Sequence, residues 1–316
     1  MPILELVRLQ RIRKHHEHCH LGHGLWPRRP PFLRSRLGAK LRRMRQTTNL
    51  TVNDAAALLD TTRSKLHRIE TGETKPSTHL IRSMMDIYDC PDPALIDEVR
   101  AALARPWYHA YSPQNRYNLD VESEATETHD FSPLVIPELL QTEDYTLALL
   151  KHWNHPSPVN EMTTRRIRQQ RLTTTEHPLR LIAVIDETAL RRNVGGAHTM
   201  RNQLQRLINT AHLPNITLNV LSTEDQGPCA LAGAFTLNVL PEATDPDVLH
   251  TGHPMMPLDT DDPATVSHAH HVFNHLRNGA LSEPDSIDLI KRTLADLGAH
   301  QPPTSSLKAN DTNEKT

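Results

Sequence analysis

Six imidazole- or thiol-bearing side chains crowd the stretch HHEHCHLGH at residues 15–23, and these are ligand types that bind zinc. Structural zinc sites, however, space their ligands in pairs so that the chain can fold back around the ion. This stretch holds one cysteine, Cys19, and no paired second cluster follows it. We therefore predict no metal site here, and we expect either a disordered arm or sequence that precedes the true start codon.

A second histidine set lies at His268, His270, His271 and His275. The last two are four residues apart, which is the helical spacing of zinc metalloprotease motifs. Val272 stands where those motifs carry the glutamate that acts as general base. We therefore expect these imidazoles to face solvent or to be hydrogen-bonded, and not to bind a metal.

Other candidates for chemistry have simpler structural explanations. Asp186 and Glu187 follow an apolar run and suit the cap and first turn of a helix. The VGG run at 194–196 lacks the spacing of a phosphate-binding loop. The sequence contains no Gly-x-Ser-x-Gly elbow, P-loop or kinase motif set. We expect no catalytic residues, no cofactor and no enzymatic activity.

Charge is distributed unevenly along the 316 residues. Seven Lys/Arg against two acidic residues give residues 1–34 a net charge of +5, and nine against four give residues 35–76 the same value. The remainder, 77–316, carries 19 Lys/Arg against 31 Asp/Glu, or −12. A basic N-terminal segment (1–76) followed by an acidic remainder predicts that the N-terminal segment binds a polyanion.

Composition also indicates the compartment. Three cysteines cannot form a disulfide framework, which fits a reducing cytoplasm. No apolar run approaches the length of a membrane span, and the charged N-terminus does not have the pattern of a signal peptide. We expect a cytoplasmic protein with no membrane partner.

The chain divides into two expected domains, 35–90 and 121–298, joined by a Pro-rich helix and linker at 91–120. A basic His-rich arm (1–34) and a polar tail (299–316) are expected to be disordered. The first domain should consist of short helices, because its cap residues and apolar positions recur at helical spacing. The signals are Thr51 and Asp54 as a capping box, Thr62 as the cap of a third helix, and Gly72 at its end.

The third helix, TRSKLHRIE at 62–70, has the composition of a helix that enters the major groove of DNA. Only Leu66 and Ile69 are expected to point inward, and the other positions carry basic or hydrogen-bonding side chains. The candidates for base contact are Arg63, Ser64, His67 and Arg68, and those for phosphate contact are Thr62, Lys65, Arg42, Arg43 and Lys75. The alternative is a solvated basic face on a small helical domain.

Residues 121–298 predict a mixed α/β domain with a small sheet flanked by helices. Apolar, β-rich runs at 180–186 and 216–221 enclose a helical pattern at 197–212, which is the order of a parallel crossover unit. Further short strands are expected at 234–241 and 247–251. The expected fold class is therefore α+β overall, with an all-α helix-turn-helix domain at the N-terminus.

The stretch LGAKLRRMRQTTNLTVNDAAALLDTTRSKLHRIETGETKPS resembles the Cro/C1-type helix-turn-helix of the XRE regulators, most specifically in RSKLHRIETG. The resemblance covers about residues 36–90. It implies that the third helix is the recognition helix and that Arg45 forms an internal ion pair with Glu70. Two positions depart from the family, since Val52 replaces a DNA-contacting Gln and Asp60 replaces a turn Gly. Asp tolerates the left-handed conformation better than most residues, so we expect the turn to survive.

The second domain carries a resemblance of its own. The runs LVIPELLQTEDYTLALL, LIAVIDETALRRNVGG, LPNITLNVL and DPDVLHTG are similar to the uncharacterised domain of a large class of actinobacterial regulators. The resemblance covers about residues 110–297 and implies a DNA-binding transcriptional regulator, with an antitoxin-like role described for some members. Glu138 stands where that family usually has Gly, which predicts an altered local turn.

We therefore predict a sequence-specific transcriptional regulator that binds double-stranded DNA as a homodimer. Its C-terminal domain is expected to sense a ligand, to dimerise or to bind a partner. A small-molecule effector requires a mostly apolar pocket between the sheet and the helices. The alternative is an antitoxin-like protein whose main role is to bind a small cognate partner protein, with DNA binding as autoregulation. That role requires an exposed apolar patch on the second domain.

Overall fold

The computed structural model describes residues 31–111, 116–224, 233–242, 245–252 and 258–299. The histidine-rich stretch at 15–23, the arm up to residue 30 and the tail from residue 300 lie outside the described residues. The described residues from 31 to 299 form one compact unit. Within the described ranges, every helix is too short or too polar to span a membrane.

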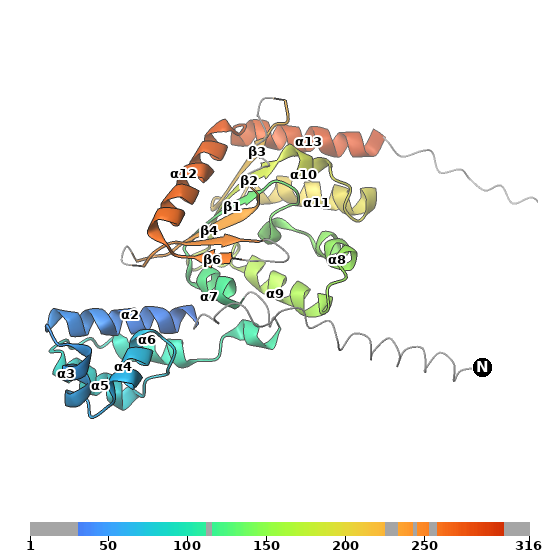
Figure 1. The fold of residues 1–316 in the computed structure, drawn as a ribbon. Coiled ribbons are helices and arrows are strands. Elements are labelled where there is room, and N and C mark those ends of the chain that lie inside the picture. The colour runs from blue at the N-terminus through green and yellow to red at the C-terminus, as the bar shows by residue number, and fades with distance from the viewer. Residues whose placement is uncertain (1–30, 112–115, 225–232, 243–244, 253–257, 300–316) are drawn as a thin grey trace, which may run out of the picture. The chain divides into compact units, whose positions relative to one another are not determined.

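The N-terminal module is a set of helices around one apolar core. Its elements are α2 (Phe32–Thr47), α3 (Val52–Leu58), α4 (Arg63–Glu70), α5 (Thr78–Ile87) and α6 (Leu95–Leu103), as Figure 1 shows. The caps follow the sequence signals, because the Thr51 and Thr62 hydroxyls each accept a hydrogen bond at 3.2 Å from the backbone N–H three residues on. The first helix begins at Phe32, inside the stretch for which we expected disorder. Tertiary contact explains this start, since Phe32 is buried and its N–H donates to Asp120 Oδ2 at 2.8 Å.

Two residues with left-handed backbone conformations flank the third helix. Asp60 has φ 46° in the turn before α4, so the expectation that Asp can replace the turn Gly is confirmed. Gly72 has φ 75° just after α4, as expected for the residue that ends this helix. A Cβ at Gly72 would also lie 2.8 Å from the backbone of Ser35 on α2, so both conformation and space require glycine there.

Gly38 lets α2 approach the end of α4 closely. A Cβ built on Gly38 would lie 2.6 Å from the carbonyl oxygens of both Ile69 and Glu70, which is far inside van der Waals contact. These obstacles are backbone atoms, so no side-chain rotation relieves the overlap.

Gly38→Ala is therefore expected to destabilise the protein by about 1–3 kcal/mol in denaturant unfolding. Intrinsic helix propensity acts in the opposite direction, because Ala is about 1 kcal/mol better than Gly inside a helix. The neighbouring exposed position supplies the control, since Ala39→Gly should lose only that propensity. A Gly38→Ala variant more stable than the parent would contradict the close approach of α2 to α4.

The C-terminal domain is built on a six-stranded sheet with the order β3-β2-β1-β4-β5-β6. Its strands are β1 (Glu127–Ser132), β2 (Arg180–Asp186), β3 (Ile216–Leu221), β4 (Phe235–Val239), β5 (Val248–Thr251) and β6 (Leu258–Thr260). The pairs β1–β2 and β2–β3 are parallel, whereas β1–β4, β4–β5 and β5–β6 are antiparallel. The parallel pairing of β2 with β3 confirms the expected crossover unit, and the fold class is α+β overall.

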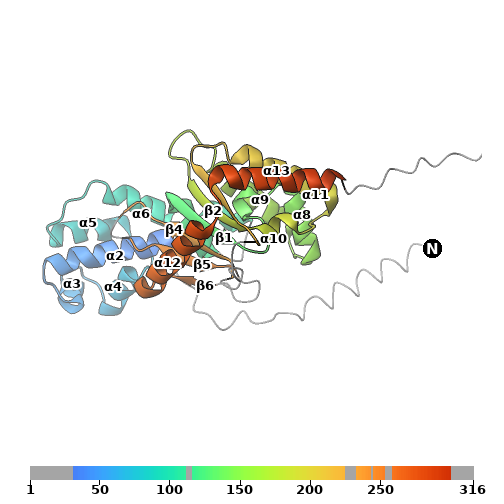
Figure 2. The same cartoon turned by 90° about the horizontal axis from the view of Figure 1, so that it is seen from above.

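Helices cover both faces of the sheet. The helices of this part of the chain are α7 (Arg116–Glu124), α8 (Glu143–His152), α9 (Pro158–Gln170), α10 (Glu187–Arg191), α11 (Gly196–Thr210), α12 (Pro263–Gly279) and α13 (Glu283–Ala299), with short 3-10 turns η1 (Trp107–Ala110) and η2 (Glu138–Leu140). Because side chains alternate along a strand, Leu181 and Ala183 join the core beneath α8, α11 and α13. Ile182 and Val184 join the core beneath α12, on the opposite face seen in Figure 2.

The central strand β1 and the helix α7 were not expected from the sequence. The β1 segment, ETHDFS, has one large apolar residue, so it lacks the alternation of a half-buried strand. Its polar side chains are nevertheless accommodated by tertiary hydrogen bonds, such as the bond of 3.0 Å from Thr128 Oγ1 to Asn238 Oδ1 on β4. Pairing with β2 and β4, and not local pattern, therefore decides the conformation of this segment.

Candidate nucleic-acid interface

The helix α4 packs on one face and presents polar side chains to solvent on the other. Leu66 and Ile69 are buried in the core of the module. The side chains proposed for base contact, together with two of the phosphate candidates, are exposed: Thr62, Arg63, Ser64, Lys65, His67 and Arg68. A basic, hydrogen-bonding helix face that is not used for packing is what major-groove recognition requires.

Some of these side chains already have partners within the module. The Thr62 hydroxyl accepts the Lys65 N–H at 3.2 Å as the helix cap. Arg68 Nε lies 3.5 Å from the Glu73 carboxylate, and both side chains are more than half exposed. An exposed ion pair of this kind contributes about 1 kcal/mol or less, so it leaves Arg68 able to exchange Glu73 for another acceptor.

The remaining phosphate candidates lie on other segments. Arg42 and Arg43 are exposed on α2. Lys75 is exposed in the segment that follows α4, and its Nζ lies 3.4 Å from the carbonyl oxygen of Leu103. The basic candidates thus come from three segments of the helical module.

A buried ion pair fixes α4 to α2. Arg45 Nε donates to Glu70 Oε1 at 2.6 Å and Arg45 Nη2 donates to Glu70 Oε2 at 2.9 Å, and both residues are buried. Arg45 Nη1 also donates to the carbonyl oxygen of Leu50 at 2.7 Å. The hydrogen bond to Glu70 raises the pKa of Arg45 further, and burial raises the pKa of neighbouring Tyr88 to about 12. Arg45 thus donates to both carboxylate oxygens of Glu70 and to one backbone carbonyl, which are the contacts expected of a pair that positions the helix.

A second set of charges, which sequence reasoning missed, lies between α7, η2 and α9. Arg168 donates to both carboxylate oxygens of Glu122 at 2.8 and 2.6 Å, and to Glu138 at 2.6 Å. Arg165 donates to Glu138 at 2.8 Å. Desolvation opposes ionisation of Glu138, but the two guanidinium groups outweigh it and lower its pKa to about 2. The carboxylate that replaces the family's usual Gly therefore has a defined structural role in this chain.

The paired carboxylates at the end of β2 have structural partners. Asp186 caps α10 by accepting the Thr188 N–H at 2.8 Å. Glu187 binds Arg191 Nε at 2.7 Å and accepts the Thr223 N–H at 3.0 Å. These contacts match the cap and first-turn roles expected from the sequence.

The histidines of α12 are spread along that helix. His268, His271 and His275 are exposed, whereas half-buried His270 pairs with Asp247 at 2.8 Å. Among the residues that the structure describes, no three His, Cys, Asp or Glu side chains are grouped so that they could hold a metal ion.

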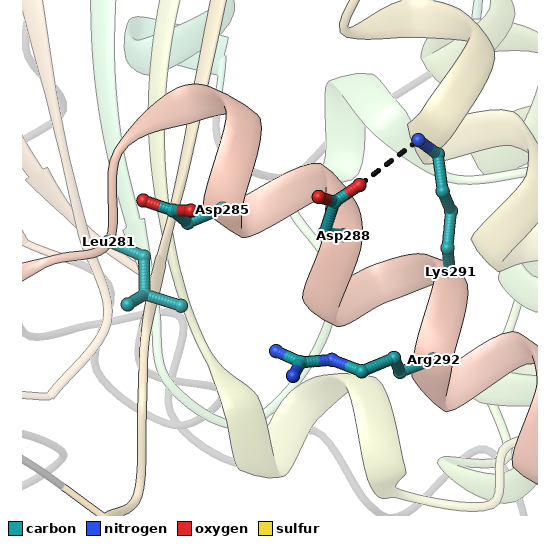
Figure 3. A pocket seen from close by; sticks show the side chains of 5 residues that line it. All are labelled: Leu281, Asp285, Asp288, Lys291 and Arg292. Carbon is teal, nitrogen blue, oxygen red and sulfur yellow. Dashed lines mark hydrogen bonds and ion pairs between the residues drawn. The ribbon is translucent and has the colours of Figure 1, made fainter.

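One surface hollow of about 560 Å³ lies over α13. Figure 3 shows its lining residues, which are Leu281, Asp285, Asp288, Lys291 and Arg292. Lys291 pairs with Asp288 on the same helix at 3.1 Å. Because four of the five side chains are charged, this hollow differs from the apolar pocket between sheet and helices that a ligand sensor was expected to have.

Exposed apolar side chains flank the connection between α8 and α9. Trp153 is 53% exposed at the end of α8, and Val159 is 74% exposed at the start of α9. Leu147 on α8 is also 45% exposed. Single exposed apolar residues are common on protein surfaces, and these three lie on the helices α8 and α9 and at the end of α8.

Two families match separate parts of the chain. Residues 36–99 match a helix-turn-helix domain family, and residues 116–292 match a family described as a domain of unknown function, DUF5753. Among solved structures, the crystal structure of the clp gene regulator ClgR from C. glutamicum matches with 24% identity and a TM-score of 0.21. That match covers 25% of this chain and 100% of the other. No curated protein matches the chain.

Proposed function

Since the chain belongs to the DUF5753 family and carries a helix-turn-helix domain before that domain, we propose that it is a sequence-specific DNA-binding transcriptional regulator. One observation carries the proposal. The helix α4 buries only its apolar edge and the pairing carboxylate of Glu70, and it leaves a continuous row of basic and polar side chains exposed. Such a face fits the major groove, where Arg recognises guanine.

The regulator acts as a homodimer in this proposal, because a single module of this size buries little surface on DNA. A dimer places two recognition helices about one helical turn of DNA apart, on a near-palindromic site. A cytoplasmic location is part of the same proposal. In the same proposal, the C-terminal DUF5753 domain senses a ligand, forms the dimer or binds a partner protein.

Selection of bound fragments from random DNA tests the proposal directly. The full-length chain is incubated with the pool at two salt concentrations, and the recovered fragments are sequenced. We expect one motif with two half-sites at both concentrations. Recovery of DNA at low salt only, without a motif, would show that binding is electrostatic and would refute sequence recognition by the chain alone.

Arg63→Ala is expected to weaken binding to the selected site by about 1–3 kcal/mol and to relax preference at one base position. Titration of labelled DNA by fluorescence anisotropy, on the site and on single-base variants, measures both effects. Arg206→Ala, at an exposed position on α11, is the control for loss of one positive charge. An equal loss on every DNA sequence would place Arg63 against phosphate and not against a base.

A second candidate function is an antitoxin-like role, in which the C-terminal domain binds a small partner protein. The exposed Trp153 and Val159 at the α8–α9 connection favour it. The test is co-expression with the product of a neighbouring gene for a short protein. A stable complex that Trp153→Ser disrupts, with DNA binding preserved, would support this role. Equal complex formation by the variant would exclude this surface.

A further inference from the structure

A cavity of about 320 Å³ lies between the first turn of α2, the end of α6, η1 and α7. Four basic side chains and one carboxylate line it, and the rest of its wall is made of leucine, alanine and proline. We call it the cation pocket, and its charged residues are Arg34, Lys75, Arg105, His109 and Asp120. Its volume is within the range of pockets that hold small molecules.

The charges of the cation pocket are unbalanced. Arg34, Lys75 and Arg105 are permanent cations, so with His109 neutral the three outnumber Asp120 and leave +2. Asp120 also has other partners, since it accepts the Phe32 N–H at 2.8 Å and the hydroxyl of a buried tyrosine. Arg105 is exposed, just beyond the C-terminal end of α6.

Arg34 provides the most specific sign of a missing partner. Its Nε is buried, yet no acceptor within the described residues bonds to it. A buried guanidinium N–H without an acceptor is unfavourable, and such groups are usually satisfied by water or by an ion. Arg34 also lies in the first turn of α2, where the helix dipole disfavours a cation, so the dipole does not explain its presence.

The positive charges near the C-terminal end of α6 can also be explained without a bound anion. Lys75 Nζ lies 3.4 Å from the Leu103 carbonyl oxygen, and a cation there is favoured by the negative end of the α6 dipole. That explanation accounts for Lys75 and for Arg105, but not for the buried Nε of Arg34 on α2. A single anion in the cavity can contact all three cations.

We propose that the cation pocket binds a small organic anion, a carboxylate or phosphate compound with a short apolar body. The guanidinium groups of Arg34 and Arg105 hold its oxygens, and the alanine and proline wall contacts its carbon atoms. One consequence rests on the proposed function. Lys75 is a candidate for phosphate contact, so an anion that occupies Lys75 lowers the affinity of the helical module for DNA.

Calorimetric titration of the full-length chain without DNA tests the site itself. Citrate and inorganic phosphate are the two probes, with ionic strength matched by sodium chloride. We expect saturable binding of at least one probe, and the tighter of the two identifies carboxylate or phosphate as the preferred chemistry. Arg34→Gln and Arg105→Gln should each weaken binding about tenfold, the effect of losing one charge-assisted hydrogen bond.

The matched control is Arg206→Gln, an exposed arginine on α11, which should leave binding unchanged. Arg105 is exposed, so Arg105→Gln keeps the test decisive even if Arg34→Gln fails to fold. Absence of saturable binding by both probes, or equal binding by Arg105→Gln and the parent, would overturn the proposal. Because DNA is absent from the titration, failure of DNA recognition and failure of the cation pocket are separate results.

Discussion

Arg45→Met is expected to destabilise the protein by about 3–5 kcal/mol, because it leaves the Glu70 carboxylate buried and unpaired. The affinity for DNA should fall as well. Glu70 is the last residue of α4, so loss of its ion-pair partner also loosens the helix that carries the base-contact candidates. Denaturant unfolding followed by circular dichroism measures the stability, and anisotropy titration on the selected site measures the accompanying loss of DNA affinity.

Arg45→Met/Glu70→Met separates an unpaired charge from general damage to the core. Replacing both partners removes the buried charges together, so the double variant should recover much of the stability lost by Arg45→Met. Arg82→Met, at an exposed position on α5, should change stability by about 0.5 kcal/mol or less. If Arg45→Met behaved like Arg82→Met, the ion pair would not be what fixes α4.

Arg168→Met is expected to have an effect of similar size on the C-terminal domain, about 3–5 kcal/mol. Arg168 is the shared partner of two carboxylates, and Glu122 is buried. Removal of the guanidinium leaves Glu122 without its bidentate donor and leaves Glu138 with Arg165. Thermal and denaturant unfolding of the full chain measure the loss.

The same helix provides the matched control for Arg168. Arg166 is exposed and lies 3.9 Å from Glu143, so Arg166→Met should change stability by about 0.5 kcal/mol or less. Arg168→Met/Glu122→Gln, which also removes the buried negative charge, should be more stable than Arg168→Met. Equal stability of Arg166→Met and Arg168→Met would show that the buried network is not required for the fold.

The sequence by itself determined the helices of the N-terminal module and the parallel strands β2 and β3 of the second domain. Cap residues and apolar spacing are local signals, so Thr51, Thr62 and Gly72 marked helix ends that the structure contains. The runs at 180–186 and 216–221 are rich in apolar residues because helices cover both sides of their sheet, and they form the parallel pair β2–β3. The exposed polar face of α4 also followed from its composition.

Only the tertiary structure decided features that depend on partners distant in the chain. The polar segment ETHDFS becomes the central strand β1 because β2 and β4 pair with it. Arg168 meets Glu122 across 46 positions and Glu138 across 30, and the cation pocket brings Arg34 together with Asp120, which lies still further along the chain. No local pattern records which charge is paired when the partners lie so far apart in sequence. Long-range packing therefore determines whether a charged residue is structural, solvated or available to a ligand.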